Sequence, residues 1–342
     1  MHRYPYETMR KRTCPTPVDL SRRDFLGQAL GASALAAGAA LSFEELSLQA
    51  AEPAKVEKGA AVRKLPTGKI RDVELSRLIC GGNLITGYAH ARDLIYVSTL
   101  LKQYFTDDKI MDTWAVCEAN GINAMIVHPN DERAVELFKK YRKERGGHIK
   151  WLAQASPGEK DMAEIIARAV SDGAVGVFLV GNQGDRWTFD QRLDLIGRFV
   201  ELVNKQGVIS GVGGHSLEMV QAVEAAGIKN DFYMKTLHNA HYWSSRRPDQ
   251  TKPVIENYSA DNYFDLEPEK TIAFMQKVKK PWIAYKVLAA GAIHPRVGFD
   301  HAFSNGADFA CVGMFDFQVA ENAVIASETV AKYEERRREW FA

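Results

Sequence analysis

Residues 171–180 read SDGAVGVFLV, and residues 206–213 read QGVISGVG. Each segment starts with polar residues and a glycine and continues as a short apolar run, which is typical of a buried strand. The stretch 190–205 between them carries apolar residues at helical spacing, and a glycine after a helix suits the left-handed residue with which many helices end. The order of strand, helix, glycine and next strand predicts parallel strands that are covered by helices.

The same unit recurs along the chain after residue 64. We predict eight strands, at residues 77–80, 124–127, 150–155, 176–180, 209–212, 232–237, 282–288 and 309–312. Helices are predicted at residues 107–120, 132–144, 161–171, 190–205, 217–226, 268–278, 296–305 and 321–339. Eight such units fit a (β/α)8 barrel, the TIM barrel, for which about 250 residues is typical. An open doubly wound sheet is the alternative, but no GxGxxG motif follows an early strand. We therefore expect a single α/β domain, a TIM barrel, at residues 65–342.

The first fifty residues differ from the rest of the chain. Ser21-Arg22-Arg23-Asp24-Phe25-Leu26 precedes a run rich in Ala, Gly and Leu that continues to Phe43. This pattern resembles a twin-arginine (Tat) signal, which implies export by the Tat translocase to the periplasm or another extracytoplasmic space. We interpret residues 1–50 as the signal segment and residues 51–64 as a linker. Cleavage before Ala51 and a retained membrane anchor both stay open.

Composition limits the classes of partner. The 342 residues include 44 Lys and Arg against 43 Asp and Glu, a net charge of +1, and 46% of them are hydrophobic. This balance is ordinary for a globular protein and disfavours disorder and a nucleic-acid partner. The four cysteines show no CxxC spacing, and we expect Cys80, Cys117 and Cys311, which lie in apolar stretches, to be buried free thiols. The expected partner is a small-molecule substrate, with sugars among the candidates, and homo-oligomerisation is left open.

A TIM barrel carries its active site at the carboxyl ends of its strands, and polar residues follow the predicted strands here. They are Asn83, His128, Asn130, Gln154, Ser156, Asn182, Gln183, Asp185, His215, Lys235, His238, Lys286 and Asp316. The connections after the first and sixth strands add His90, Arg92, His241, Tyr242 and Trp243. We expect substrate-binding residues among Asn83, His90, Arg92, His128, Asn130, Gln154, Asn182, His241, Tyr242 and Trp243. Aromatic rings beside Asn and Arg suit a sugar, and a packed rim or a dimer contact is the alternative.

The N-terminal part of the predicted barrel carries a first family resemblance. Thr67-Gly68-Lys69, Gly81-Gly82-Asn83 and Gly121-Ile122-Asn123 are similar to the opening of aldo/keto reductases. In that family an Asp of the second strand is catalytic, and here it would fall near Ile126. No Tyr follows with the spacing of the family. The resemblance therefore supports the fold, and an oxidoreductase that uses NAD(P) is an alternative function.

A second resemblance lies in the sixth and seventh predicted strands. Asp231-Phe232-Tyr233-Met234-Lys235-Thr236 and Tyr285-Lys286-Val287-Leu288 resemble the corresponding strands of class I aldolases of the deoxyribose-phosphate type. The resemblance implies that Lys235 forms a Schiff base with a carbonyl substrate and that Lys286 lowers its pKa. Two ammonium groups held together disfavour each other's charge, as burial does, and a lysine attacks a carbonyl only when it is neutral. A structural ion pair with Asp185 or Asp316 is the alternative for such a lysine.

These observations lead to a principal function and three alternatives. We expect an exported lyase, aldolase or isomerase in which Lys235 is the nucleophile, Lys286 tunes it, His215 or His238 moves protons and Asp316 orients them. Gly313-Met314-Phe315-Asp316-Phe317 places a carboxylate where a phosphate cradle would lie, so the substrate is an unphosphorylated carbonyl compound or keto-sugar. No cofactor is required in this interpretation. The alternatives are the NAD(P)-dependent reductase, a metal-dependent sugar isomerase or hydrolase, and a non-catalytic sugar-binding module.

The metal alternative depends on histidines at neighbouring strand ends. His128, His215 and His238 are the candidate ligands for a divalent metal, because imidazoles at adjacent strand ends can share an ion. The chain as a whole also resembles a group of Tat-exported TIM-barrel proteins. The segments that carry this resemblance are residues 81–85, 89–94, 235–238, 242–244 and 312–317. This last resemblance implies no reaction.

Overall fold

A computed structural model describes residues 65–88, 90, 94, 96–242, 245, 246, 249 and 265–342. The predicted signal segment at residues 1–50 and the linker at residues 51–64 lie outside the described residues. The same is true of two expected substrate-binding residues, Arg92 and Trp243. None of the helices in the described part of the chain is long and apolar enough to cross a membrane.

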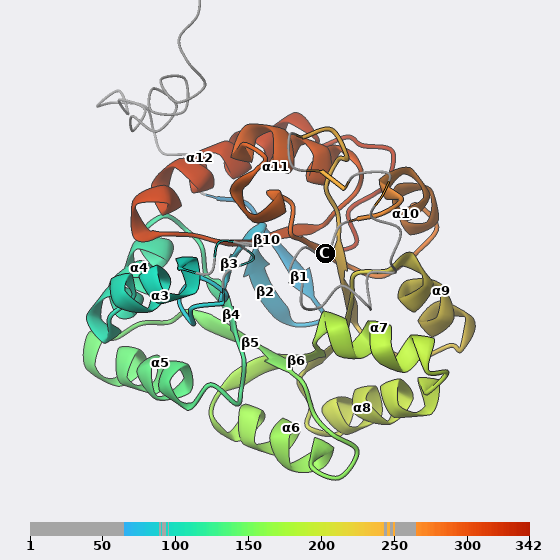
Figure 1. Cartoon of the computed structure of the whole chain (residues 1–342), viewed down its shortest axis with the longest axis horizontal. Helices are drawn as coiled ribbons and strands as arrows, with labels where there is room; N and C mark the ends of the chain where they lie inside the picture. The colour runs from blue at the N-terminus through green and yellow to red at the C-terminus, as the bar shows by residue number, and fades with distance from the viewer. Residues whose placement is uncertain are drawn as a thin grey trace, which may run out of the picture. The chain divides into compact units, whose positions relative to one another are not determined.

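Eight parallel strands form a closed barrel, which confirms the predicted TIM-barrel fold (Figure 1). They are β3 (Leu78–Gly81), β4 (Ala124–Val127), β5 (Lys150–Ala155), β6 (Ala174–Leu179), β7 (Ile209–Gly214), β8 (Phe232–Thr236), β9 (Trp282–Tyr285) and β10 (Phe309–Gly313). Each strand pairs with its successor, and β10 pairs with β3 in the register Ala310↔Leu78, which closes the ring. The carboxyl ends of all eight strands therefore meet at one end of the barrel, which we call the mouth.

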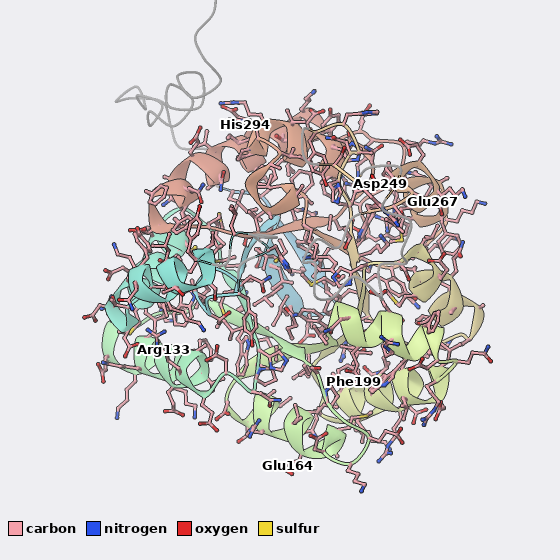
Figure 2. The ribbon with its side chains drawn as sticks, viewed as in Figure 1. Arg133, Glu164, Phe199, Asp249, Glu267 and His294 are labelled. Carbon is pink, nitrogen blue, oxygen red and sulfur yellow. The ribbon has the colours of Figure 1, made fainter. Side chains whose placement is uncertain are left out.

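Helices surround the barrel (Figure 1). They are α3 (Val97–Tyr104), α4 (Asp107–Ala119), α5 (Glu132–Arg145), α6 (Met162–Ser171), α7 (Gly181–Phe189), α8 (Leu193–Lys205), α9 (Leu217–Ala225), α10 (Pro268–Met275), the short 3-10 helix η2 (Ala289–Gly291), α11 (Pro295–Ser304) and α12 (Asp316–Lys332). Figure 2 shows charged side chains such as Arg133 and Glu164 on the outer rim of this ring, and both residues are exposed. The apolar faces of the helices pack inward against the strands.

The core has two layers, one on each face of the strands. The lumen cluster fills the barrel and consists of Ile70, Leu75, Ile79, Ala124, Ile126, Leu152, Phe178, Ile209, Phe232, Met234, Ile283, Phe309 and Cys311. A second, larger cluster lies between the strands and the helices and includes Tyr233, Leu237, Trp282 and Ala284. Successive residues of a strand point to opposite faces. Membership of the two clusters therefore shows which way each strand side chain points.

An antiparallel hairpin, β1 (Thr67–Ile70) and β2 (Val73–Ser76), lies at the amino end of the barrel. Its Ile70 and Leu75 belong to the lumen cluster. The side chain of Arg71 donates to the carbonyl of Val208, just before β7, and Lys150 donates to the carbonyl of Glu74. The hairpin thus covers the end opposite the mouth, and Thr67-Gly68-Lys69, one of the three segments that resemble the opening of aldo/keto reductases, forms part of this cover.

The last helix, helix α7 and the seventh strand differ from the prediction. The last helix was expected at residues 321–339 but spans Asp316–Lys332, because Arg336 and Arg338 turn back to bond the buried Asp308. Helix α7 was not expected, because its sequence GNQGDRWTF contains two glycines and has a low helix propensity. The strand expected at residues 282–288 ends at Tyr285, since the next residue has a left-handed φ of 58°.

Candidate active site at the barrel mouth

A buried histidine and aspartate form a pair at the mouth. His215 follows β7, and its Nδ1 lies 2.7 Å from Oδ2 of Asp185 on helix α7. The backbone N–H groups of His215 and Ser216 also donate to this carboxylate, at 3.0 Å and 3.1 Å. Both side chains are almost wholly buried, with 6% of His215 and 4% of Asp185 exposed. Several donors thus fix the carboxylate, which in turn fixes the imidazole.

The environment of His215 keeps its imidazole neutral. Burial lowers the pKa of His215 to about 4, although the hydrogen bond that its ring makes to the carboxylate of Asp185 acts in the opposite direction. A carboxylate accepts hydrogen bonds, so the proton of the neutral ring lies on Nδ1 and Nε2 is an acceptor. A neutral imidazole that a carboxylate holds in this tautomer is the arrangement of a general base.

Gly181 and Tyr285 lie against this pair. The rings of His215 and Tyr285 have their centroids 5.3 Å apart. Gly181, the first residue of α7, leaves room for both: a Cβ at this position would lie 2.3 Å from the Tyr285 hydroxyl oxygen and 2.7 Å from Cε1 of His215. A side chain at position 181 is therefore incompatible with the present positions of the two rings.

We expect Gly181→Ala to displace His215 or Tyr285 and to lower the free energy of unfolding by about 1–3 kcal/mol, the usual cost of overpacking. Urea unfolding measures the stability, and long-range ¹H–¹⁵N spectra of the imidazole report the displacement. The matched control is Gly197→Ala on helix α8, where a Cβ meets nothing within 4 Å and which we expect to be neutral or stabilising. An unchanged imidazole spectrum in Gly181→Ala would contradict the prediction.

Lys286 reaches the mouth through an unusual backbone conformation. It follows β9 directly with a φ of 58°, and Ala289 and Ala290 have φ of 45° and 58°. Without this turn, strand alternation would point Lys286 outward, on the face of Ala284. Instead, its Nζ lies 2.6 Å from Nε2 of His90, to which Asn83 Nδ2 also approaches at 2.9 Å. Left-handed non-glycine residues store strain and gather at functional sites.

Lys286 and His215 interact electrostatically. The charge of Lys286 contributes to the low pKa of His215, and so does His90. The mouth therefore combines a neutral base, a cationic amine and the phenol of Tyr285. His215 and Lys286 directly follow β7 and β9, Tyr285 ends β9, and α7 and the connection after β3 add Asp185 and His90. Of the expected site residues, the structure places Asn83, His90, His215 and Lys286 in this arrangement.

Lys235 lies on the other face of its strand. Phe232 and Met234 point into the lumen, so Lys235 points outward with Tyr233, toward the helix layer. Its amine is fully buried, donates to the carbonyl of Thr236 at 2.8 Å and lies 3.7 Å from Oδ1 of Asp265. Burial lowers the pKa of Lys235 and raises that of Asp265. The structural alternative of an ion pair thus applies, with Asp265 as the acid in place of Asp185 or Asp316.

His238 and Asp316 also lie apart from the pair. The Nδ1 of His238 donates to the carbonyl of Asn239, and its Nε2 accepts from the N–H of Asp265. Both ring nitrogens are therefore hydrogen-bonded to backbone groups. Asp316 accepts from the Tyr104 hydroxyl at 2.5 Å and from Lys109 at 2.9 Å, which joins α12 to α3 and α4. His238, whose pKa the charge of Lys235 helps to lower, thus uses both ring nitrogens for backbone contacts, and Asp316 is engaged with α3 and α4. The sequence had predicted that these two residues move and orient protons for Lys235.

The remaining expected residues that the structure describes have other surroundings. His128 Nδ1 accepts from the N–H of Asn130, whose side chain binds Arg168 on α6. Gln154 shares the inward face of β5 with Leu152, Asn182 and His241 are exposed, and the ring of Tyr242 packs edge-on to His238 at 5.5 Å. Within the described residues no group of three or more His, Cys, Asp or Glu side chains is gathered as a metal would need. His128, His215 and His238 therefore do not converge there as a ligand set.

Two members of the arrangement, Gly181 and Tyr285, were not expected as site residues. Asp185 was expected among the polar residues at the strand ends and as a structural partner of a lysine, without a catalytic role. Alternation from Ile283 would have placed Tyr285 on the inward face of its strand. The role of Asp265 has no signal in the sequence, because the residue follows a long connection and meets Lys235 only in the fold.

The buried histidines predict a pH dependence of stability. In folded protein the pKa values of His215 and His238 are about 4, against an ordinary value of 6.5. Between these values the unfolded chain binds protons that the folded chain does not, so stability is complete above about pH 6.5 and falls as the pH drops to about 4. Each histidine contributes at most about 3 kcal/mol. Urea unfolding at pH 7 and pH 4.5 measures the loss, His238→Gln is expected to reduce it, and equal stability at both pH values would contradict the assignment.

Comparison with known proteins supports the fold. No protein-family model matches the chain, and no curated protein does. Two solved structures of a putative aldo-keto reductase from Pseudomonas aeruginosa are similar to it, each with a TM-score of 0.51. They are 17% and 16% identical, cover 80% and 77% of this chain and align over 99% and 96% of their own. A phospho-2-dehydro-3-deoxyheptonate aldolase from Thermotoga maritima is 10% identical over 78% of this chain and 73% of its own, with a TM-score of 0.45. At identities of 17% and 16%, the likeness to the two reductase structures concerns the fold alone.

Proposed function

We propose that the protein is an enzyme, a lyase or isomerase that acts on an unphosphorylated carbonyl compound through a Schiff base on Lys286. The observation that carries this proposal is the Asp185–His215 pair, which holds a neutral imidazole at the mouth with Lys286 as its cationic neighbour. The principal interpretation of the sequence is kept, but the two lysines exchange roles. Lys286 is the nucleophile, and Lys235 is a structural residue that pairs with Asp265.

The chemistry follows from the two groups. The ammonium group of Lys286 passes a proton to Nε2 of His90, 2.6 Å away, and becomes nucleophilic. The amine attacks the carbonyl carbon to form a carbinolamine. The oxygen then leaves as water, with one hydrogen from the amine nitrogen and the proton that His90 returns, and an iminium ion remains. This cation withdraws electrons from the adjacent carbon. His215 Nε2 then accepts a proton from that carbon for isomerisation, or from a hydroxyl group one carbon further for carbon–carbon cleavage.

Reductive trapping tests this function. The protein is incubated with hydroxyacetone, dihydroxyacetone or glycolaldehyde and borohydride, which reduces an iminium to a stable secondary amine. Peptide mass spectrometry then locates the adduct. We expect it on the peptide that contains Lys286 and not on the peptide that contains Lys235. An adduct on Lys235, or none with any of these compounds, would overturn the proposal.

A further inference from the structure

The hydroxyl group of Thr236 is buried at the mouth without a hydrogen-bond partner. Thr236 is the last residue of β8 and is wholly buried. Its Oγ1 has no hydrogen-bond partner in the part of the chain that the structure describes. A buried hydroxyl left in this way costs free energy, and such atoms are few in native proteins. The position of Thr236 therefore calls for an explanation.

The side chain of Thr236 points into the barrel. It alternates with Phe232 and Met234, which belong to the lumen cluster, so it shares their inward face. In the sheet, Thr236 pairs with Tyr285 on one side, and Lys235 pairs with Gly214, the residue before His215, on the other. The hydroxyl group thus lies in the same layer of the mouth as His215 and Tyr285, between the strands that carry them.

The backbone around Thr236 is held firmly. The N–H of Leu237 donates to the carbonyl of Tyr285, and the indole N–H of Trp282 donates to the carbonyl of Lys235. The carbonyl of Thr236 itself accepts from Lys235. The buried ion pair of Lys235 therefore supports β8 on its helix-facing side. On the side that faces the lumen, the hydroxyl group is the polar atom of Thr236 that is available to a ligand.

We propose that Thr236 Oγ1 binds a hydroxyl group on the carbon next to the substrate carbonyl, so that the substrates are 2-hydroxy ketones, 2-hydroxy aldehydes or ketoses. This inference rests on the proposed function. A threonine hydroxyl both donates and accepts, as a substrate hydroxyl does, so one contact satisfies both groups. A ketone without that hydroxyl leaves Thr236 unpaired, and a site built to bond a hydroxyl group rejects such an analogue.

Two ketones that differ by one hydroxyl group test the inference. Hydroxyacetone and acetone are titrated into the protein, and their dissociation constants are measured by NMR without borohydride. The variants are Thr236→Val, which keeps the shape and removes the hydroxyl, and Thr236→Ser, which keeps the hydroxyl. We expect wild type to bind hydroxyacetone about tenfold more tightly than acetone, and Thr236→Val to lose that preference. Thr236→Ser should keep most of it.

Stability provides a second readout that separates a binding role from a structural one. Because valine removes an unpaired buried polar atom, we expect Thr236→Val to unfold at the same or a higher temperature than wild type. A lower unfolding temperature would mean that the hydroxyl holds the fold, and it would overturn the inference. Equal affinity for the two ketones, or no measurable affinity for either, would also overturn it.

The outcomes for the two proposals are distinguishable. If hydroxyacetone binds in a manner that depends on Thr236 but no adduct forms on Lys286, the result supports the hydroxyl site and contradicts the Schiff base. If both ketones are trapped on Lys286 with equal yield at equal concentration, the result supports the Schiff base and contradicts the role of Thr236.

Discussion

Lys286→Met is expected to abolish the borohydride-trapped adduct and to reduce turnover of a carbonyl substrate by at least about 10³-fold, the effect of removing a covalent nucleophile. Methionine keeps the length and apolar stem of lysine but has no amine. It is also an L residue, so it meets the left-handed φ of 58° with the same strain as lysine, and the backbone has no added reason to move. The measurement is adduct yield by mass spectrometry, together with the rate of any reaction that the trapping identifies.

The matched control for Lys286→Met is the other lysine. Lys235→Met alone would leave Asp265 buried without its partner, so the double variant Lys235→Met/Asp265→Asn removes both charges of the buried pair. We expect this variant to form the adduct on Lys286 in normal yield. If the double variant loses the adduct while folded and Lys286→Met retains it, Lys235 is the nucleophile and the assignment of roles is reversed.

Asp185→Asn is the second change with a large expected effect. The carboxylate of Asp185 accepts a hydrogen bond from Nδ1 of His215, whereas the amide of asparagine donates one to that nitrogen. The proton of the neutral ring then lies on Nε2, so the imidazole presents an N–H at the mouth in place of an acceptor. A base in the wrong tautomer is ineffective, and in comparable pairs this loss is about 10⁴-fold. We expect hydrogen–deuterium exchange at the carbon next to the carbonyl of hydroxyacetone, followed by ¹H NMR, to slow by about 10²–10⁴-fold.

This variant separates the base from the nucleophile. Asp185→Asn should still form the adduct on Lys286, because the amine is intact, and ¹⁵N spectra of His215 should show the change of tautomer. The control is Asp194→Asn, which changes an exposed acid that pairs with Arg192 on the surface. Exchange at the wild-type rate in Asp185→Asn would show that His215 is not the base.

Local sequence patterns predicted most of the fold. The strands at Ala124–Val127 and Lys150–Ala155 have the predicted bounds, because a short apolar run between a turn and a helix is a local feature. The last helix was misplaced, because its end depends on Arg336 and Arg338 reaching the buried Asp308, far away in the sequence. Helix α7 was missed, since tertiary contacts override the low propensity of its glycines.

The site was predicted less well, and Lys235 and Lys286 show why. Which face of β8 points inward depends on the register with Gly214 and Ala284 on its neighbours, and a shift by one residue reverses every side chain. Lys235 therefore faces the helices. Lys286 faces the mouth only because its left-handed φ interrupts the alternation. The amino-acid types alone indicate neither the direction of Lys235 nor the left-handed φ of Lys286.

The sequence by itself determined the eight strand–helix units, the closed barrel that they form and the end at which polar residues gather, because periodicity and turn residues act over a few neighbours. The tertiary structure decided which of those residues share the site. Strand register turned Lys235 away and Thr236 inward, and the packing of α7 against β7 brought Asp185 to His215. These are contacts between segments distant in sequence, and their geometry is set only when the barrel closes.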